Sequence, residues 1–348
     1  MLEESYMKGE MYMKRGLSVL VLMLVSFALF GGGTKEAPQA PAAKPAEKQI
    51  VMRLGETHRA DYPTTRGDME FARLVNERTN GRIKIDVYHS SQLGEEKAVI
   101  EQVQFGAIDF TRVSISPLSA FAKHFDALQM PYLYRDAEHM WKVLNGPIGE
   151  EFLQSLEKAN FVGLCWYDSG ARNFYNSKRE IKSPADLKGL KIRVQQSELM
   201  MNMVAALGAI PTPMPFGEVY SALQTGVIDG AENNWPSYIS TSHYEVAKYF
   251  TLDEHTRVPE ITIGSKIVLD KLSKEDQAII KKAAKDSMPY QIAEWKKEEK
   301  IAEEKARKAG CVITVLPSNA EFQAAMKPLY DKLTPDLQEV VRRIREVK

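Results

Sequence analysis

The sequence predicts an α/β fold of two similar lobes, and three observations lead to this prediction. From residue 49 onward, short apolar segments with the alternation of β-strands are followed by segments with the period of amphipathic helices. Residues 104–109, QFGAID, return as residues 224–229, QTGVID. Residues 273–310 have the composition of a long helix. Because strands that alternate with helices pair in parallel, we expect mainly parallel sheets and, between the lobes, a cleft for a small molecule.

The expected elements follow the same order in both halves. The first half predicts a strand at 50–55, a helix at 71–78, a strand at 83–87, a helix from 99 to 105 and a strand at 108–110. The second half predicts a strand at 190–194, a helix at 200–207, a helix at 216–224 and a strand at 227–229. The helices are followed by glycines, which adopt the left-handed conformation that ends a helix: Gly81, Gly106, Gly208 and Gly226.

The C-terminal third is dominated by the long helix at 273–310. Ser273 is a candidate N-cap, and Glu275 and Asp276 place negative charge in the first turn, where the helix dipole favours it. Pro289 should kink or divide the helix. Residues 296–308 carry charges of both signs at helical spacing, which indicates a solvated helix face rather than a binding patch.

The N-terminal residues predict export from the cytoplasm. Lys14 and Arg15 precede an apolar run at 17–30, which is the layout of a signal-type leader over residues 1–30. The run is short for a membrane span, although an uncleaved anchor stays open. Residues 31–48, rich in Ala, Pro and Lys, predict a solvated linker. The segment resembles a lipoprotein leader without the cysteine that would carry the lipid, so tethering to the membrane also stays open.

Composition excludes several classes of function. The 348 residues contain 46 Lys and Arg and 46 Asp and Glu, and this zero net charge favours neither nucleic acid nor an anionic membrane as a partner. No G-x-S-x-G, P-loop, H-E-x-x-H or dinucleotide fingerprint is present after a strand, so we expect no enzyme and no cofactor. No spacing suits a metal, and we expect Cys165 and Cys311 to be free thiols.

Arginines at strand ends are the candidate binding groups. Arg193 lies on the strand at 190–194, Arg172 follows the strand at 161–166 in a loop, and Arg112 follows the strand at 108–110. A guanidinium presents two parallel donors to a carboxylate, which lysine does not match. For each arginine, an ion pair at the surface or between the lobes is the structural alternative.

Four segments resemble a known family. They are residues 91–94 (SQLG, followed by two acidic residues), 189–194 (GLKIRV), 211–226 (PTPMPFGEVYSALQTG) and 227–233 (VIDGAEN). The chain from about Ile50 to its C-terminus resembles the solute-binding proteins of TRAP (tripartite ATP-independent periplasmic) transporters. The resemblance implies a two-lobed periplasmic binding protein fold, a long helix spanning both lobes, and closure on a carboxylate. It also implies a TRAP permease in the membrane as partner, and we expect a monomer.

The resemblance also implies an organisation and a set of site residues. We expect the first lobe to comprise residues 49–169 and 259–297, and the second lobe residues 170–258 and 298–348. Arg193 matches the arginine that forms the paired salt bridge with the ligand carboxylate, and Arg172 matches a second ligand arginine. The remaining matches are Asn233, which assists; Phe216, an aromatic wall; Glu96, an acceptor for hydroxyls; and Arg112 and Ser114, which vary with ligand class.

A hexuronate such as glucuronate or galacturonate is the expected ligand. Residues 234–238 (NWPSY) and 252–255 (LDEH) resemble the hexuronate-binding branch of the family. Besides Glu96 and Asn233, the side chains of Asn234, His58 and Asp253 could bond several hydroxyls. A C4-dicarboxylate or another organic acid is the first alternative. An ABC-type receptor and a periplasmic enzyme are the other classes left open.

Overall fold

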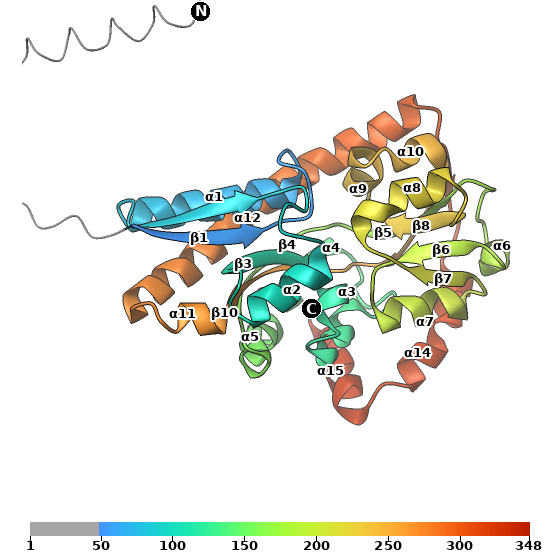
Figure 1. Ribbon diagram of the computed structural model, residues 1–348. Coiled ribbons are helices and arrows are strands. Elements are labelled where there is room, and N and C mark those ends of the chain that lie inside the picture. The colour runs from blue at the N-terminus through green and yellow to red at the C-terminus, as the bar shows by residue number, and fades with distance from the viewer. Residues whose placement is uncertain (1–48) are drawn as a thin grey trace, which may run out of the picture. The chain divides into compact units, whose positions relative to one another are not determined.

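The computed structural model describes residues 49–348. The predicted leader (1–30) and linker (31–48) lie outside the described residues. The described part contains two sheets, which lie side by side in Figure 1. The strand order in the first sheet is β2 (Ile83–Tyr88), β1 (Ile50–Gly55), β3 (Phe110–Ser114), β10 (Glu260–Ser265) and β4 (Phe161–Tyr167). In the second sheet it is β11 (Val312–Val315), β9 (Tyr249–Thr256), β5 (Arg172–Asn176), β8 (Gly230–Asn233), β6 (Lys191–Val194) and β7 (Ile210–Pro213).

Helices connect these strands. Those that follow strands of the first sheet are α1 (Pro63–Arg78), α2 (Glu96–Gln104), α3 (Ile115–Leu118), α4 (Ala137–Leu144), α5 (Pro147–Ser155) and α11 (Lys266–Leu269). Those that follow strands of the second sheet are α6 (Pro184–Leu187), α7 (Glu198–Ala206), α8 (Val219–Gln224), α9 (Trp235–Ser240) and α10 (His243–Val246). After α12 (Lys274–Lys308) and β11 come α13 (Ala320–Ala325), α14 (Lys327–Asp331) and α15 (Pro335–Glu346). The 3-10 helices are η1 (Lys123–Gln129), η2 (Leu156–Ala159) and η3 (Phe216–Glu218).

Each sheet is mainly parallel, with one strand reversed against its neighbours. β1 pairs in parallel with β2 and β3, β6 with β7 and β8, and β11 with β9. β10 and β5 are antiparallel to both of their neighbours. The reason is connectivity, because β4 leads through residues 168–171 into β5 of the other sheet, and β9 returns through residues 257–259 into β10. The carboxyl ends of β1, β3, β4, β6, β8 and β9 therefore lie at the side where the chain crosses between the sheets.

The internal repeat forms equivalent structures in the two sheets. Asp109 Oδ2 accepts a hydrogen bond from the N–H of Arg53, within the adjacent strand β1 (2.6 Å), and Asp229 Oδ2 accepts one from the N–H of Lys191, the first residue of β6 (2.9 Å). Gly106 and Gly226 have φ of +76° and +74°, as expected for glycines that end helices. The prediction that residues 227–229 form a strand is wrong, since β8 begins at Gly230. The Ile228 N–H still bonds to the Ala222 carbonyl, so these residues complete the end of the helix.

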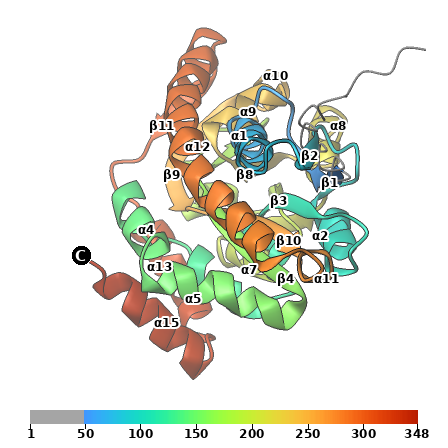
Figure 2. The same ribbon diagram turned by 90° about the vertical axis from the view of Figure 1, so that its left-hand side faces the viewer.

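The long helix α12 contacts elements around both sheets. It packs against α1 and β4 of the first part and against α9 of the second (Figures 1 and 2). Ser273 caps it as predicted, accepting a hydrogen bond from the Asp276 N–H (3.1 Å). Pro289 does not divide the helix, which is continuous over 35 residues. Gly67 of α1 permits close packing here, because a Cβ at this position would lie 2.8 Å from Gln291 Cγ of α12.

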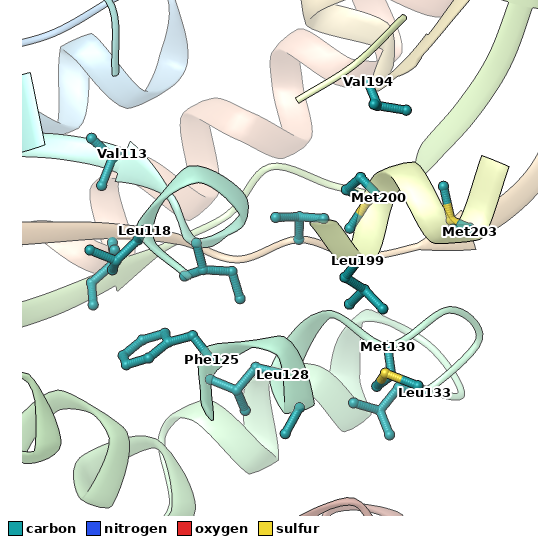
Figure 3. Close-up of a cluster of buried hydrophobic side chains, with 14 of the residues drawn as sticks. Val113, Leu118, Phe125, Leu128, Met130, Leu133, Val194, Leu199, Met200 and Met203 are labelled. Atoms are coloured by element: carbon teal, nitrogen blue, oxygen red, sulfur yellow. The ribbon is translucent and has the colours of Figure 1, made fainter. Parts of the chain in front are cut away.

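The largest apolar cluster joins the two parts on another side. This cluster, part of which Figure 3 shows, includes Val113, Leu118 and Phe125 from the part of the chain around β3 and Val194 and Met200 from the part around β6. All five side chains are buried. This shared core keeps the two sheets of residues 49–348 in one folded unit, while the site lies where the chain crosses between them.

Candidate functional site

A small cavity lies at the carboxyl ends of the strands, where loops of both sheets meet. This is where open α/β sheets bind ligands. The lining residues are Thr57, His58, Tyr62, Thr64, Glu96, Ser169, Arg172, Arg193, Gln195, Phe216, Asn233, Asn234, Ser237 and Glu260. In this conformation the cavity has a free volume of about 20 Å³, which is enough for a water molecule. The walls must therefore part to admit anything as large as a sugar.

Arg193 is buried in this cavity without an acidic partner. Its side chain extends from β6, only 3% of the residue is exposed, and its Nε and Nη2 donate to the Met214 carbonyl (3.1 and 2.8 Å). Within residues 49–348, no carboxylate forms an ion pair with it. Burial lowers the pKa of Arg193 from its ordinary value, which shows that the surroundings do not compensate its charge fully. The Phe216 ring lies beside it, 6.0 Å from the guanidinium carbon.

Arg172 is also buried, but its charge is already matched. Its Nε and Nη2 bond to the two carboxylate oxygens of Glu232, and Nη1 donates to Asn233 Oδ1 (3.1 Å). Burial alone would raise the pKa of Glu232, but the Arg172 charge and hydrogen bonds from His255 and Arg172 lower it to about 2. Arg172 is the first residue of β5 rather than part of a loop, because its backbone pairs with Thr256 of β9. It presents an oriented donor to the cavity rather than an unmatched cation.

Asp253 lies behind this pair and does not line the cavity. Its oxygens accept from the Phe174 N–H (3.1 Å) and from His255 Nδ1 (2.8 Å), and His255 Nε2 lies 3.4 Å from Glu232. Burial would lower the pKa of His255, but Asp253 and Glu232 raise it to about 9, so the imidazole is protonated at neutral pH. Contact of Asp253 with a ligand hydroxyl is therefore not supported by its position.

Arg112 is enclosed by three carboxylates and likewise does not line the cavity. Its Nε donates to Glu56 Oε2 (2.7 Å), and its Nη1 donates to Glu260 Oε2 (2.6 Å) and Glu96 Oε1 (3.3 Å). Neither Arg112 nor the Glu56 side chain is exposed. Ser114, the other position expected to vary with ligand class, is buried, and its N–H donates to Glu96 (2.9 Å). Arg112 and Ser114 thus hold Glu96 and Glu260 in place at the wall.

Seven of the ten predicted site residues line the cavity, and the three that do not are Arg112, Ser114 and Asp253. Prediction from sequence missed seven lining residues, among them Glu260, Gln195 and Tyr62. Gln195 comes two residues after Arg193 at the end of the same strand, and this spacing could have revealed it. Tyr62 bonds across to Asn234 (3.3 Å) and Ser237 (2.8 Å), contacts between distant segments for which the sequence carries no local signal.

Glu260 makes the stability of the protein depend on pH. Burial, assisted by Glu96 and Glu56 and opposed by Arg112, raises its pKa from the ordinary 4.5 to about 7. The folded protein therefore binds this proton more tightly than the unfolded chain does, so the free energy of unfolding falls as the pH rises from 4.5 to 7. We expect urea denaturation to show this fall, and Glu260→Gln to reduce it by on the order of 1 kcal/mol. If the free energy of unfolding falls equally in the wild type and in Glu260→Gln, Glu260 is not the group responsible.

The described residues also bear on disulfides, metal sites and apolar helices. Cys165 and Cys311 are unpaired, as predicted. In residues 49–348 no cluster of three or more His, Cys, Asp or Glu side chains is placed to hold a metal ion. The same residues include no helix with the length and apolar character that a membrane crossing needs.

Known proteins resemble this chain over most of its length. Residues 54–336 match the DctP family, described as bacterial extracellular solute-binding protein, family 7. The structure of a TRAP periplasmic solute-binding protein from a Bradyrhizobium species, in complex with α/β-D-galacturonate, is 46% identical. It covers 85% of this chain and 99% of its own, with a TM-score of 0.84. A TRAP protein from Chromohalobacter salexigens with bound D-glucuronate is 37% identical, covering 85% and 100%, with a TM-score of 0.83.

A third relative carries a different ligand in its name. The C4-dicarboxylate-binding periplasmic protein DctP of Rhodobacter capsulatus is 31% identical over 288 residues, which are 82% of this chain and 86% of that protein. The two solved structures share the fold of this chain, and the Rhodobacter protein shares its sequence over most of its length. The chain therefore belongs to the DctP family and is a periplasmic solute-binding protein of a TRAP transporter, not an enzyme.

Proposed function

We propose that this protein captures a hexuronate, such as galacturonate or glucuronate, through a paired salt bridge between Arg193 and the ligand carboxylate. The observation that carries the proposal is the burial of Arg193 at 3% exposure with a backbone carbonyl, and no carboxylate of residues 49–348, as its partner. A buried charge without an opposite charge beside it costs several kcal/mol, and a ligand carboxylate in the cavity would remove part of that cost.

The rest of the lining supports a hydroxylated acid. Glu96, Asn233, Asn234 and His58 surround the cavity with hydrogen-bonding groups. Burial lowers the pKa of His58, and Arg112 lowers it further, so this imidazole is neutral and adds no cation. The Gln195 Oε1 atom is buried and has no hydrogen-bond partner in the described part of the chain, so it is ready to accept from a hydroxyl. Two similar TRAP proteins hold galacturonate and glucuronate, which have this chemistry.

A C4-dicarboxylate fits the same lining less well. It would need a second unmatched cation for its second carboxylate. Arg172 is already neutralised by Glu232, and Arg112 is enclosed by Glu56, Glu96 and Glu260. The charges of the cavity thus favour one carboxylate with hydroxyls over two carboxylates.

Capture requires the two lobes to part and close again, since the cavity admits only water-sized molecules in this conformation. We place the first lobe at residues 49–169 and 259–297 and the second at 170–258 and 298–348, with hinges where the chain crosses at 168–171 and 257–259. The ligand shifts the equilibrium toward the closed form by its better affinity for that form. The closed protein, exported by its N-terminal leader, then delivers the acid to a TRAP permease driven by an ion gradient.

A thermal-shift panel tests the proposed ligand class. It compares D-glucuronate, D-galacturonate, an aldonate, sialic acid and succinate on the same protein. A ligand at 100 times its Kd stabilises the folded state by roughly 2.7 kcal/mol, which raises the Tm measurably. We expect the two hexuronates to raise the Tm and succinate to leave it unchanged. A response to succinate alone would show that the ligand is a dicarboxylate.

A further inference from the structure

A second chamber adjoins the cavity on its outer side. It measures about 340 Å³, in the range of small-molecule pockets, which hold about 300–1,000 Å³. Thr57, His58 and Phe216 line both spaces, so they form the partition between them. The His58 and Phe216 ring centroids are 5.1 Å apart, which closes the passage in this conformation. We call this space the outer chamber. It is the larger of the two spaces, and the capture of a single hexuronate does not require it.

The outer chamber is lined by hydroxyls and rings. Beyond the partition, its walls include Ser90, Ser91, Tyr220, Ser240 and Thr241. Hydroxyl groups beside aromatic faces suit an uncharged sugar, whose hydroxyls exchange hydrogen bonds while its C–H faces pack on rings. The two charged groups on the rim are already engaged, since Arg59 pairs with Asp61 (3.2 Å) and Glu95 Oε1 accepts from the Ser91 hydroxyl (2.9 Å).

His243 contributes a buried donor or acceptor that lacks a partner. It lines the outer chamber and is 1% exposed. Its Nδ1 lies 2.8 Å from the Tyr175 hydroxyl, whereas its Nε2 has no hydrogen-bond partner in the described part of the chain. Burial, with the Arg193 charge adding to it, lowers the pKa of His243 to about 3, so the imidazole is neutral. A buried polar atom without a partner is costly, and a ligand hydroxyl at this position would satisfy it.

The backbone at Ser90 and Ser91, which also line the outer chamber, is strained. Ser90 and Ser91 both have φ of +56°, a left-handed conformation that non-glycine residues rarely adopt and that two adjacent residues adopt more rarely still. The Ser90 N–H bonds to the His58 carbonyl (2.7 Å), which fixes this turn against the partition. Such strain gathers at ligand sites, where the surrounding structure holds it in place.

We propose that the outer chamber is a subsite for a neutral sugar joined to the acid, so that the protein also captures aldobiouronates, in which a hexuronate is glycosidically linked to an uncharged sugar. The acid occupies the inner cavity, as in the proposed function on which this inference rests, and the neutral sugar lies beyond His58 and Phe216. A second uronate is disfavoured, because the chamber offers no unmatched cation among residues 49–348.

Calorimetry with three probes and three variants tests the subsite. The probes are D-glucuronate, glucuronate linked to D-xylose, and digalacturonate. Ser240→Phe fills the outer chamber, and His243→Phe keeps a ring but removes the unpartnered nitrogen. Ser221→Phe, on the exposed face of α8, controls for the added ring. We expect Ser240→Phe and His243→Phe to weaken the binding of the glucuronate–xylose disaccharide at least tenfold, whereas Ser221→Phe should leave it unchanged. Digalacturonate should bind the wild type more weakly than that disaccharide does.

Binding of D-glucuronate alone distinguishes a failure of the proposed subsite from a failure of the proposed function. It should stay within about twofold of the wild type in Ser240→Phe, which also shows that this variant folds. If the wild type binds glucuronate but not the disaccharide, or if Ser240→Phe leaves disaccharide affinity unchanged, the subsite is refuted and the proposed function stands. If the wild type binds no hexuronate at all, the proposed function itself fails.

Discussion

Arg193→Met weakens the binding of D-glucuronate by roughly 100-fold, since truncating one partner of a buried charge pair costs about 2–5 kcal/mol. Arg193→Lys weakens it less, because the ammonium keeps the charge but loses one of the two parallel donors. Arg193 has no carboxylate partner in residues 49–348, so removing its charge leaves no acid uncompensated there. We therefore expect Arg193→Met to unfold at a Tm no lower than that of the wild type without ligand.

Calorimetry and thermal unfolding measure these two effects on the same samples. Arg342→Met is the matched control, because Arg342 is exposed on α15 and pairs with Glu339. It should leave ligand affinity unchanged. An Arg193→Lys variant that binds glucuronate as tightly as the wild type would remove Arg193 from the role of carboxylate ligand.

Arg112→Met, in contrast to Arg193→Met, strongly lowers the stability of the folded protein. Arg112 and Arg193 are buried to a similar extent, but Arg112 balances Glu56, Glu96 and Glu260. Although burial alone would lower it, these carboxylates hold the pKa of Arg112 well above its ordinary value. Removal of the arginine leaves buried acids unpaired, which costs about 3–5 kcal/mol, or roughly 10 °C in Tm.

The pH dependence distinguishes this mechanism from a simple loss of packing. In Arg112→Met the deficit should shrink as the pH falls from 7 to 5, because the orphaned carboxyls take up protons and lose their charge. Urea denaturation at the two pH values provides the measurement. A deficit of the same size at both would mean that lost contacts, rather than unpaired charge, cause the destabilisation.

The order of the elements was predictable because it depends on local patterns. Apolar alternation, helical periodicity and capping glycines placed β1, β2, β6, α7 and α12 close to their actual bounds. The reversed strands β5 and β10 were not predictable in this way, because their direction follows from the chain crossing between sheets. Residues 227–229 misled the prediction, since an apolar run after a glycine looks like a strand although its backbone still completes a helix end.

The arginines show where sequence patterns stop being informative. The sequence places Arg112, Arg172 and Arg193 at or near strand ends, and their sequence contexts do not rank them. In the structure Arg112 instead lies in the middle of β3. The three arginines differ in the acids that surround them, and these come from distant segments: Glu260 for Arg112, 148 residues away, and Glu232 for Arg172, 60 residues away. The resemblance to TRAP proteins selected Arg193, and the fold supplies a physical reason by leaving that arginine without an acid.

A crystal structure of the complex with D-glucuronate tests the central claim most directly. The account predicts the ligand carboxylate paired with the Arg193 guanidinium, the hydroxyls on Glu96, Asn233 and Gln195, and the Arg172–Glu232 pair unbroken. A carboxylate bound instead to Arg172, with Glu232 displaced and a hydroxyl at Arg193, would contradict it.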